Sequence, residues 1–96
     1  MTTNIDFTSV HNHYERPVFD AVSRLAPNYP YLEADALPDV ACVALNRLGS
    51  RYIRHTVDLN FYLTEKERLA IEQTIGEAVT YAFEFVQARI AMRARR

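Results

Sequence analysis

Very little in this sequence interrupts a helix or crosslinks the chain. Its 96 residues include two glycines, four prolines, one cysteine and no tryptophan. The lone Cys42 cannot form an internal disulfide or supply a cysteine cluster for zinc. No apolar run approaches the roughly 20 residues that span a bilayer, and the first residues, MTTNIDFTSV, lack the pattern of a signal peptide. These absences indicate a cytoplasmic protein that does not act in a membrane.

Charge of one sign is also scarce. Eleven Lys and Arg residues against twelve Asp and Glu residues give a formal net charge of −1, which argues against a broadly basic nucleic-acid binder. The apolar fraction of 49% is sufficient for a globular core. A chain of this length forms one domain. We therefore expect a single domain over residues 1–96, with flexible ends at 1–8 and 94–96.

The scarcity of glycine and the absence of alternating apolar strands predict an all-α fold. The first helix is expected over about residues 9–25, where Pro17 either kinks the helix or lies in its first turn. The proline-containing stretch APNYPYLEADAL is expected to be a loop. A second helix is expected from about Pro38 to Gly49, because glycine commonly ends a helix.

A long third helix is expected from Thr64 to about Arg93. Thr64 and Glu67 match the capping box that begins many helices. Two apolar stripes follow, the first formed by Leu69, Ile75, Val79, Ala82, Phe83, Val86 and Ile90, and the second by Ile71, Ala78, Tyr81, Phe85 and Met92. A helix that is apolar on two sides needs two surfaces to pack against. We therefore predict a homodimer with Tyr81, Phe85 or Phe83 near the interface; packing within one chain is the alternative.

Patterns typical of catalysis or metal binding are weak. His11, His13 and Glu15 are potential metal ligands, but on a helix the two histidines would point about 160° apart, whereas two-histidine sites use i, i+4 spacing. A simpler role for Asn12 and His13 is bonding to free backbone groups at a helix start. Cys42 is expected to be a buried small hydrophobe of the second helix. We expect no enzyme activity, no catalytic residue, no cofactor and no metal.

The stretch LNRLGSRYIRHTVDLNFYLT, residues 45–64, gathers cations in a chain that is otherwise nearly neutral. Before its first acid it contains three arginines, a histidine and an aromatic ring: Arg47, Arg51, Arg54, His55 and Tyr52. An extended segment would place Arg51 and Arg54 on opposite sides, whereas a helical turn would bring them together. Guanidinium groups bind phosphate oxygens and the O6/N7 edge of guanine. The stretch therefore suits a phosphate-bearing purine ligand. The alternative is a solvated turn in which Arg51 and Arg54 pair with acids, namely Asp58, Glu33 or Asp35.

The chain resembles the ComFB family, named from late competence development proteins. The resemblance is carried by VHNHYE, by DVACVALNRL and RYIRH, and by FYLT before the third helix. It implies a small helical fold that dimerises. Cyanobacterial members of the family are cytoplasmic, non-enzymatic receptors for cyclic di-GMP, and in some cases cyclic di-AMP, which pass the signal to other proteins. A metal site found in some Gram-positive relatives depends on extra cysteines that this chain lacks, so it is not carried over.

The positions that match this family and carry suitable chemistry are Asn46, Arg47, Arg51, Tyr52, Arg54 and His55. We expect Arg51 and Arg54 to contact phosphate or guanine, and Tyr52 to pack on a base or sugar. The expected function is that of a homodimeric cyclic di-GMP receptor, with cyclic di-AMP as a second ligand, that signals through a protein partner such as a transcription regulator.

Two rival functions come from other classes of protein. The first is an adaptor whose cationic stretch docks an acidic protein without binding a nucleotide. The second is a small nucleic-acid-binding regulator that uses the basic tail RIAMRARR, with Arg89, Arg93, Arg95 and Arg96. A simpler explanation of that tail is a charge complement to the end of a helix.

Overall fold

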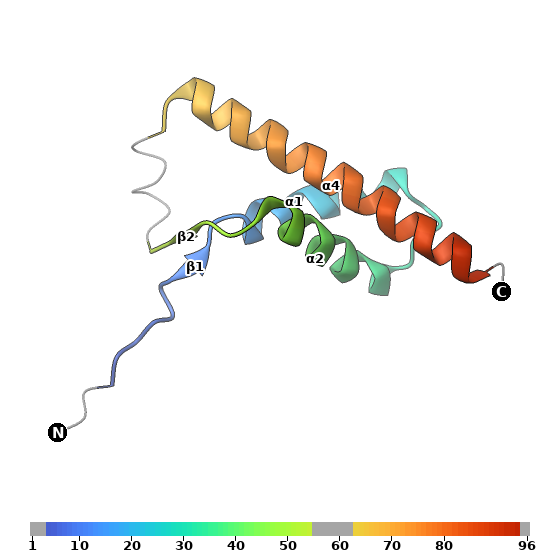
Figure 1. The fold of residues 1–96 in the computed structure, drawn as a ribbon, viewed down its shortest axis with the longest axis horizontal. Helices are drawn as coiled ribbons and strands as arrows, with labels where there is room; N and C mark the ends of the chain where they lie inside the picture. Colours follow the sequence, from blue (N-terminus) through green and yellow to red (C-terminus); the bar gives the residue numbers. More distant parts are fainter. Residues whose placement is uncertain (1–3, 55–62, 95–96) are drawn as a thin grey trace.

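The computed structural model describes residues 4–54 and 63–94, most of which are helical (Figure 1). The helices are α1 (Glu15–Leu25), α2 (Leu37–Leu48) and α4 (Glu65–Ala94), and two short 3-10 helices, η1 (Ala26–Asn28) and η2 (Ala34–Ala36), lie between α1 and α2. Strands β1 (His11–Asn12) and β2 (Tyr52–Ile53) pair antiparallel. The all-α prediction is therefore right about the framework and misses this small sheet, which we call the β-ribbon. None of the described helices is long and apolar enough to cross a membrane.

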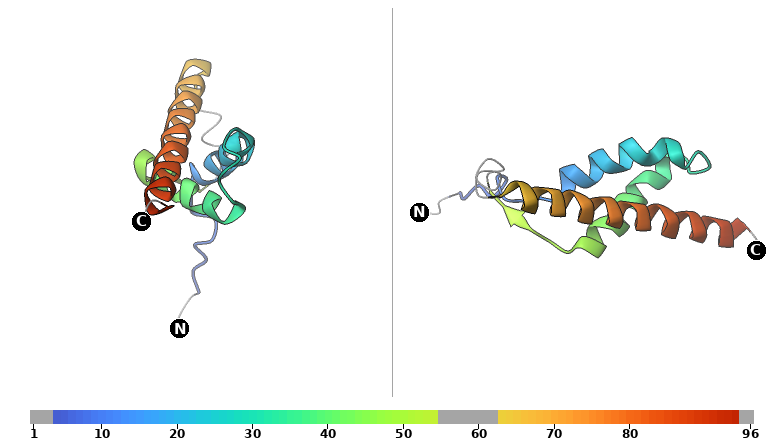
Figure 2. Two further views of the ribbon diagram at one scale, coloured as in Figure 1. Left: turned by 90° about the vertical axis from the view of Figure 1, so that its right-hand side faces the viewer. Right: turned by 90° about the horizontal axis from the view of Figure 1, so that it is seen from above.

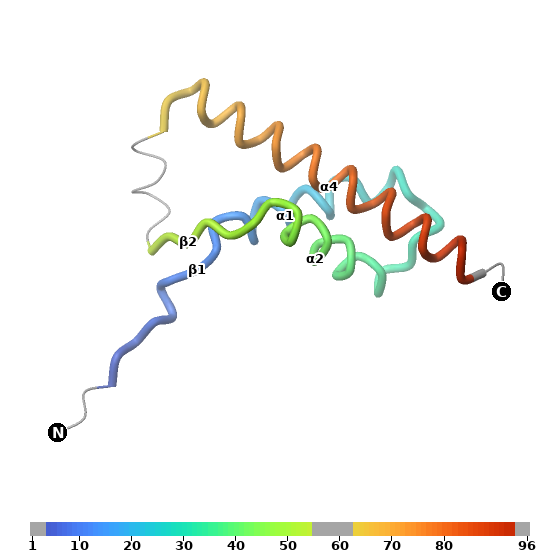
Figure 3. Tube along the Cα trace, viewed as in Figure 1, coloured from blue at the N-terminus to red at the C-terminus, as the bar shows by residue number. Residues whose placement is uncertain are grey.

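Helices α1 and α2 form a V, and α4 runs across both of them (Figure 2). The opening turns of α4 extend beyond the other helices, while the N-terminal segment leaves the body on the opposite side of the β-ribbon (Figure 3). The helices meet in one core, whose largest fully buried side chains are Val18 of α1, Val40 of α2, and Val79 and Phe83 of α4.

The ring of Phe83 also fixes the connection between α1 and α2. Tyr29 stacks on it with ring centroids 4.3 Å apart and planes inclined by 3°. The predicted loop is therefore partly ordered by 3-10 turns and packs its aromatic side chain against the core. Phe83 is fully buried within the chain, so it offers no exposed surface to the dimer interface predicted near Tyr81, Phe85 or Phe83.

Helix α1 begins later than predicted, at Glu15 instead of about residue 9. Pro17 lies in its first turn, where the missing amide hydrogen needs no partner. Residues 11 and 12 belong instead to β1, because their backbone pairs with β2. Of the two predicted alternatives, a helix kinked at Pro17 or a helix with Pro17 in its first turn, the structure has the second.

The predicted ends of the other helices are close to those observed. Helix α2 ends at Gly49, whose φ of 76° favours glycine. At the start of α4, the hydroxyl oxygen of Thr64 accepts the backbone N–H of Glu67 at 3.1 Å, as in a capping box.

One side chain is more exposed than predicted, and one apolar stripe of α4 is only partly covered within the chain. Cys42 is exposed, so its predicted burial is wrong; it lies two positions from both Val40 and Ala44, which is about 200° around a helix from each buried neighbour. The second apolar stripe of α4 divides, because Ala78 is buried within the protomer while Tyr81, Phe85 and Met92 remain exposed.

Burial within one chain predicts different costs for two phenylalanines of α4. Phe83→Ala should lower the free energy of unfolding by about 3–5 kcal/mol, because it removes a buried ring together with the stacking contact that this ring makes. Phe85→Ala, at a half-exposed position, should cost about 1 kcal/mol or less. Chemical denaturation of both variants checks the difference, and equal losses would contradict the packing described here.

Candidate ligand-binding site

The β-ribbon decides how the cationic stretch is presented. His11 pairs with Ile53 and Asn12 with Tyr52, and the backbone N–H of His13 donates to the carbonyl of Arg51 at 2.6 Å. The segment is thus extended at Tyr52 and Ile53. Of the two predicted alternatives, an extended segment or a helical turn, the structure has the first. Directly paired residues share a face of the pleat, so Arg51 lies on the face of His11 and His13, and Tyr52 lies on the other.

A buried side chain holds this arrangement together. Asn12 is 8% exposed, and its Oδ1 accepts the backbone N–H of Tyr14 at 3.2 Å and that of Arg51 at 3.0 Å. The first bond prepares the start of α1, and the second fixes the residue before β2. The predicted bonding of Asn12 to backbone groups at a helix start is confirmed. Arg51 is anchored through its main chain, while its side chain is exposed.

Tyr52 and Arg54 provide an open surface beside this anchor. Tyr52 is 67% exposed, and the Nε of Arg54 donates to the Oγ of Ser9 at 3.3 Å. The Ser9 bond is long and exposed, so it leaves the guanidinium accessible to a ligand. His55, predicted to add a hydrogen bond here, lies outside the described residues.

The two predicted site residues of α2 are placed differently. Asn46 is exposed on α2. The guanidinium carbon of Arg47 lies 3.9 Å from the centroid of the Tyr81 ring, a cation–π contact that directs the side chain toward α4. Of the predicted set, the described structure therefore assembles Arg51, Tyr52 and Arg54 on the β-ribbon, whereas Arg47 contacts α4.

Two residues of the site were missed as ligand-binding candidates, although their sequence motif had been noted. On a helix His11 and His13 would diverge, but two residues apart along an extended strand they point to the same side. Both line a hollow of about 530 Å³ with Arg16 and Asp20 of α1. Among the described residues, no group of three His, Cys, Asp or Glu side chains could hold a metal ion.

Burial, together with the charges of Arg51 and His11, lowers the pKa of His13 below its ordinary value. The neutral imidazole is therefore favoured in the unliganded protein, because a second positive charge beside Arg51 is repelled. His13 is consequently a neutral hydrogen-bonding group beside the arginine at pH 7.

The alternative of a salt-bridged turn finds no support among the residues that the structure describes. Within 4.0 Å, neither Arg51 nor Arg54 forms an ion pair with Glu33 or Asp35 there. The third candidate partner, Asp58, lies outside the described ranges. In the part of the chain that the structure describes, the side chains of Arg51 and Arg54 are exposed and form no ion pair.

The two hydrogen bonds that the Oδ1 of Asn12 accepts give a direct test of the anchor. Asn12→Ala should lower the free energy of unfolding by about 1–3 kcal/mol, because two N–H groups lose their shared acceptor. Asn12→Asp is the matched control, since it retains an acceptor oxygen beside a helix start and an arginine. Thermal or urea denaturation measures both. An alanine variant as stable as the parent would show that the shared acceptor does not hold the β-ribbon.

Comparison with known proteins gives a family match over most of the chain. A family model described as late competence development protein ComFB matches residues 11–90. The match begins at β1 and ends in α4, so it includes the whole β-ribbon and the helices that position it. Neither the curated proteins nor the solved structures contain a match to the chain. The family resemblance inferred from the sequence motifs is confirmed, and the chain belongs to the ComFB family.

Proposed function

We propose that this protein is a non-enzymatic cytoplasmic receptor for a cyclic dinucleotide, chiefly cyclic di-GMP, that relays the signal to a protein partner such as a transcription regulator. The supporting observation is the exposure of Tyr52 on strand β2 and of Arg51 and Arg54 at its two ends, with the backbone of Arg51 held by a buried asparagine. A backbone fixed before binding lowers the entropy cost of ordering the site around a ligand.

The chemistry of the β-ribbon matches the parts of such a ligand. A cyclic dinucleotide carries two phosphates and two purines, so its site requires cations, hydrogen-bonding groups and flat surfaces together. Arg51 supplies a guanidinium for phosphate, with His11 and His13 on the same face. On the other face, Tyr52 provides a ring for a base. Guanine offers two acceptors to an arginine fork, whereas adenine presents a donor at the equivalent position.

Arg51 and Tyr52 lie on opposite faces of the β-ribbon, which limits how one ligand is held. A ligand that contacts both must cross the edge of the β-ribbon or lie between two copies of it. A two-fold dimer presents the same surface twice, and a cyclic di-GMP molecule has two equivalent halves. A symmetric pair of β-ribbons is therefore our preferred arrangement.

The shape of a single chain also favours a homodimer. Its radius of gyration is 16.5 Å, whereas a compact domain of this length has a value of about 13 Å. The second apolar stripe of α4 leaves Tyr81, Phe85 and Met92 exposed within one chain. An apolar stripe that is only partly covered within one chain is typical of a helix that packs against a second copy.

The main rival remains an adaptor whose cationic surface docks an acidic protein. Calorimetry with cyclic di-GMP, cyclic di-AMP and the linear dinucleotide separates the two functions, because an adaptor would bind none of them. Equal affinity for the two cyclic dinucleotides would be consistent with arginine–phosphate contacts. It would contradict the proposed contact between an arginine and the O6/N7 edge of guanine.

Arginine variants test the ligand site directly. Arg51→Ala and Arg54→Ala should each weaken cyclic di-GMP binding by about ten- to hundredfold, since a bidentate arginine contributes about 1–3 kcal/mol. Thermal stability should change little, because Arg51 is anchored through its backbone and Arg54 makes one exposed side-chain bond. Calorimetry and thermal denaturation provide the two measurements.

Arg24→Ala, at the far end of α1, is the matched control and should bind as the parent does. If Arg51→Ala and Arg54→Ala both bound with the parent's affinity, the binding site would not be on the β-ribbon. Unfolding of either variant would instead assign its arginine a structural role.

The homodimer is tested by a charge placed in the exposed stripe. Tyr81→Glu should weaken dimerisation at least about tenfold, because the interface would lose an aromatic ring and desolvate a carboxylate in its place. Thr80→Glu is the matched control, since the neighbouring position is exposed and points about 100° away. Light scattering over micromolar concentrations measures both. A parent protein that is monomeric throughout this range would contradict the prediction.

A further inference from the structure

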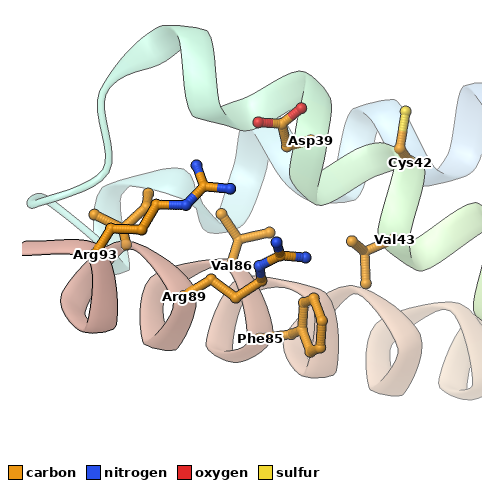
Figure 4. A pocket seen from close by; sticks show the side chains of 8 residues that line it. Asp39, Cys42, Val43, Phe85, Val86, Arg89 and Arg93 are labelled. Carbon is orange, nitrogen blue, oxygen red and sulfur yellow. The ribbon is translucent and has the colours of Figure 1, made fainter.

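A second group of cations lies away from the β-ribbon, where the last turns of α4 pass α2. The side chains there enclose a pocket of about 310 Å³. Figure 4 shows the guanidinium groups of Arg89 and Arg93 lying over the gap between the two helices, with Asp39 on the facing helix. Val43, Val86 and Ile90 form the apolar part of the lining, and the ring of Phe85 lies at one side.

The direction of these arginines bears on the predicted nucleic-acid-binding tail. A basic tail that grips a nucleic acid should present its cations outward along the helix end. Arg89 and Arg93 instead turn toward α2, and Arg95 and Arg96 lie outside the described residues. The described part of the tail is thus arranged around a pocket.

The charge in this pocket is only partly compensated. Asp39 lies in the first turn of α2, where the helix dipole already stabilises a carboxylate. Within the described part of the chain, no ion pair of 4.0 Å or less joins Asp39 to either arginine. Two guanidinium groups therefore remain available for an external anion.

We propose that the pocket between α2 and α4 binds an organic phosphate of mononucleotide size through Arg89 and Arg93. Two separate guanidinium forks suit a phosphate group, whose several oxygens can accept from both, whereas one fork suffices for a planar carboxylate. The Arg89 guanidinium lies 5.8 Å from the centroid of the Phe85 ring. This ring bounds the pocket beside Arg89, and a flat base can lie over the apolar side chains of Val43, Val86 and Ile90.

The remaining features define the rest of the ligand. Asp39 faces the arginines across the gap, where its carboxylate can accept hydrogen bonds from a sugar hydroxyl or a base amino group. The volume of about 310 Å³ is at the lower end of the range for small-molecule sites, which is about 300–1,000 Å³. One nucleotide fits such a pocket, whereas a cyclic dinucleotide does not fit within it, so this site is distinct from the one proposed on the β-ribbon.

Titration with guanosine 5′-monophosphate, followed by nitrogen-15 NMR of the full chain, tests the proposal. The arginine side-chain signals of Arg89 and Arg93 should shift on binding, and Arg89→Gln or Arg93→Gln should weaken binding at least about tenfold. Arg68→Gln is the matched control on the opening turn of α4, and it should leave the affinity within about twofold of the parent's. Guanosine without phosphate should bind at least about tenfold more weakly.

Three results would overturn the proposal. The first is equal binding of guanosine and guanosine 5′-monophosphate, which would remove the phosphate contact. The second is parent-like affinity in both glutamine variants. The third is a change in their association state in light scattering, which would assign the arginines to an interface between copies. Both variants should retain the parent's affinity for cyclic di-GMP, so failure here is distinguishable from failure of the β-ribbon site.

Discussion

The amide oxygen of Asn12 joins two parts of the chain that are far apart in sequence. It accepts one N–H at the start of α1 and another immediately before β2. Because the side chain is buried, water cannot readily replace either bond. The backbone of Arg51 is thereby fixed against the N-terminal segment, while the side chains of Arg51 and Tyr52 stay exposed. The geometry of the candidate ligand site thus depends on a neutral side chain that is itself buried.

The sequence predicted the elements that local signals control. Proline near a helix start, glycine at a helix end and a threonine cap each act within a few residues, and the corresponding ends of α1, α2 and α4 follow them. The apolar spacing of α4 likewise identified most of its buried side, including Val79 and Phe83. These features are predictable because the physical cause and its effect lie in the same short segment.

The β-ribbon was not predicted, because its pairing joins residues about forty positions apart and two-residue strands carry no alternating pattern. Because a helix was predicted there, His11 and His13 were expected to point apart, whereas the extended backbone places them on one side. The predicted helix also hid their proximity to Arg51. For the same reason, the contact between Arg47 and Tyr81 was not foreseen: the ring belongs to another helix, and no local signal pairs it with the arginine.

The exposed position of Cys42 has a practical consequence. It is the single cysteine of the chain, and it lies on α2 facing away from Val40 and the core. One spin label can therefore be attached at a defined place without removing any other thiol. In an assembly of two copies, the separation of the paired labels would report the relative placement of the two α2 helices, with and without a bound ligand. The label-to-label distance would thus measure the quaternary geometry.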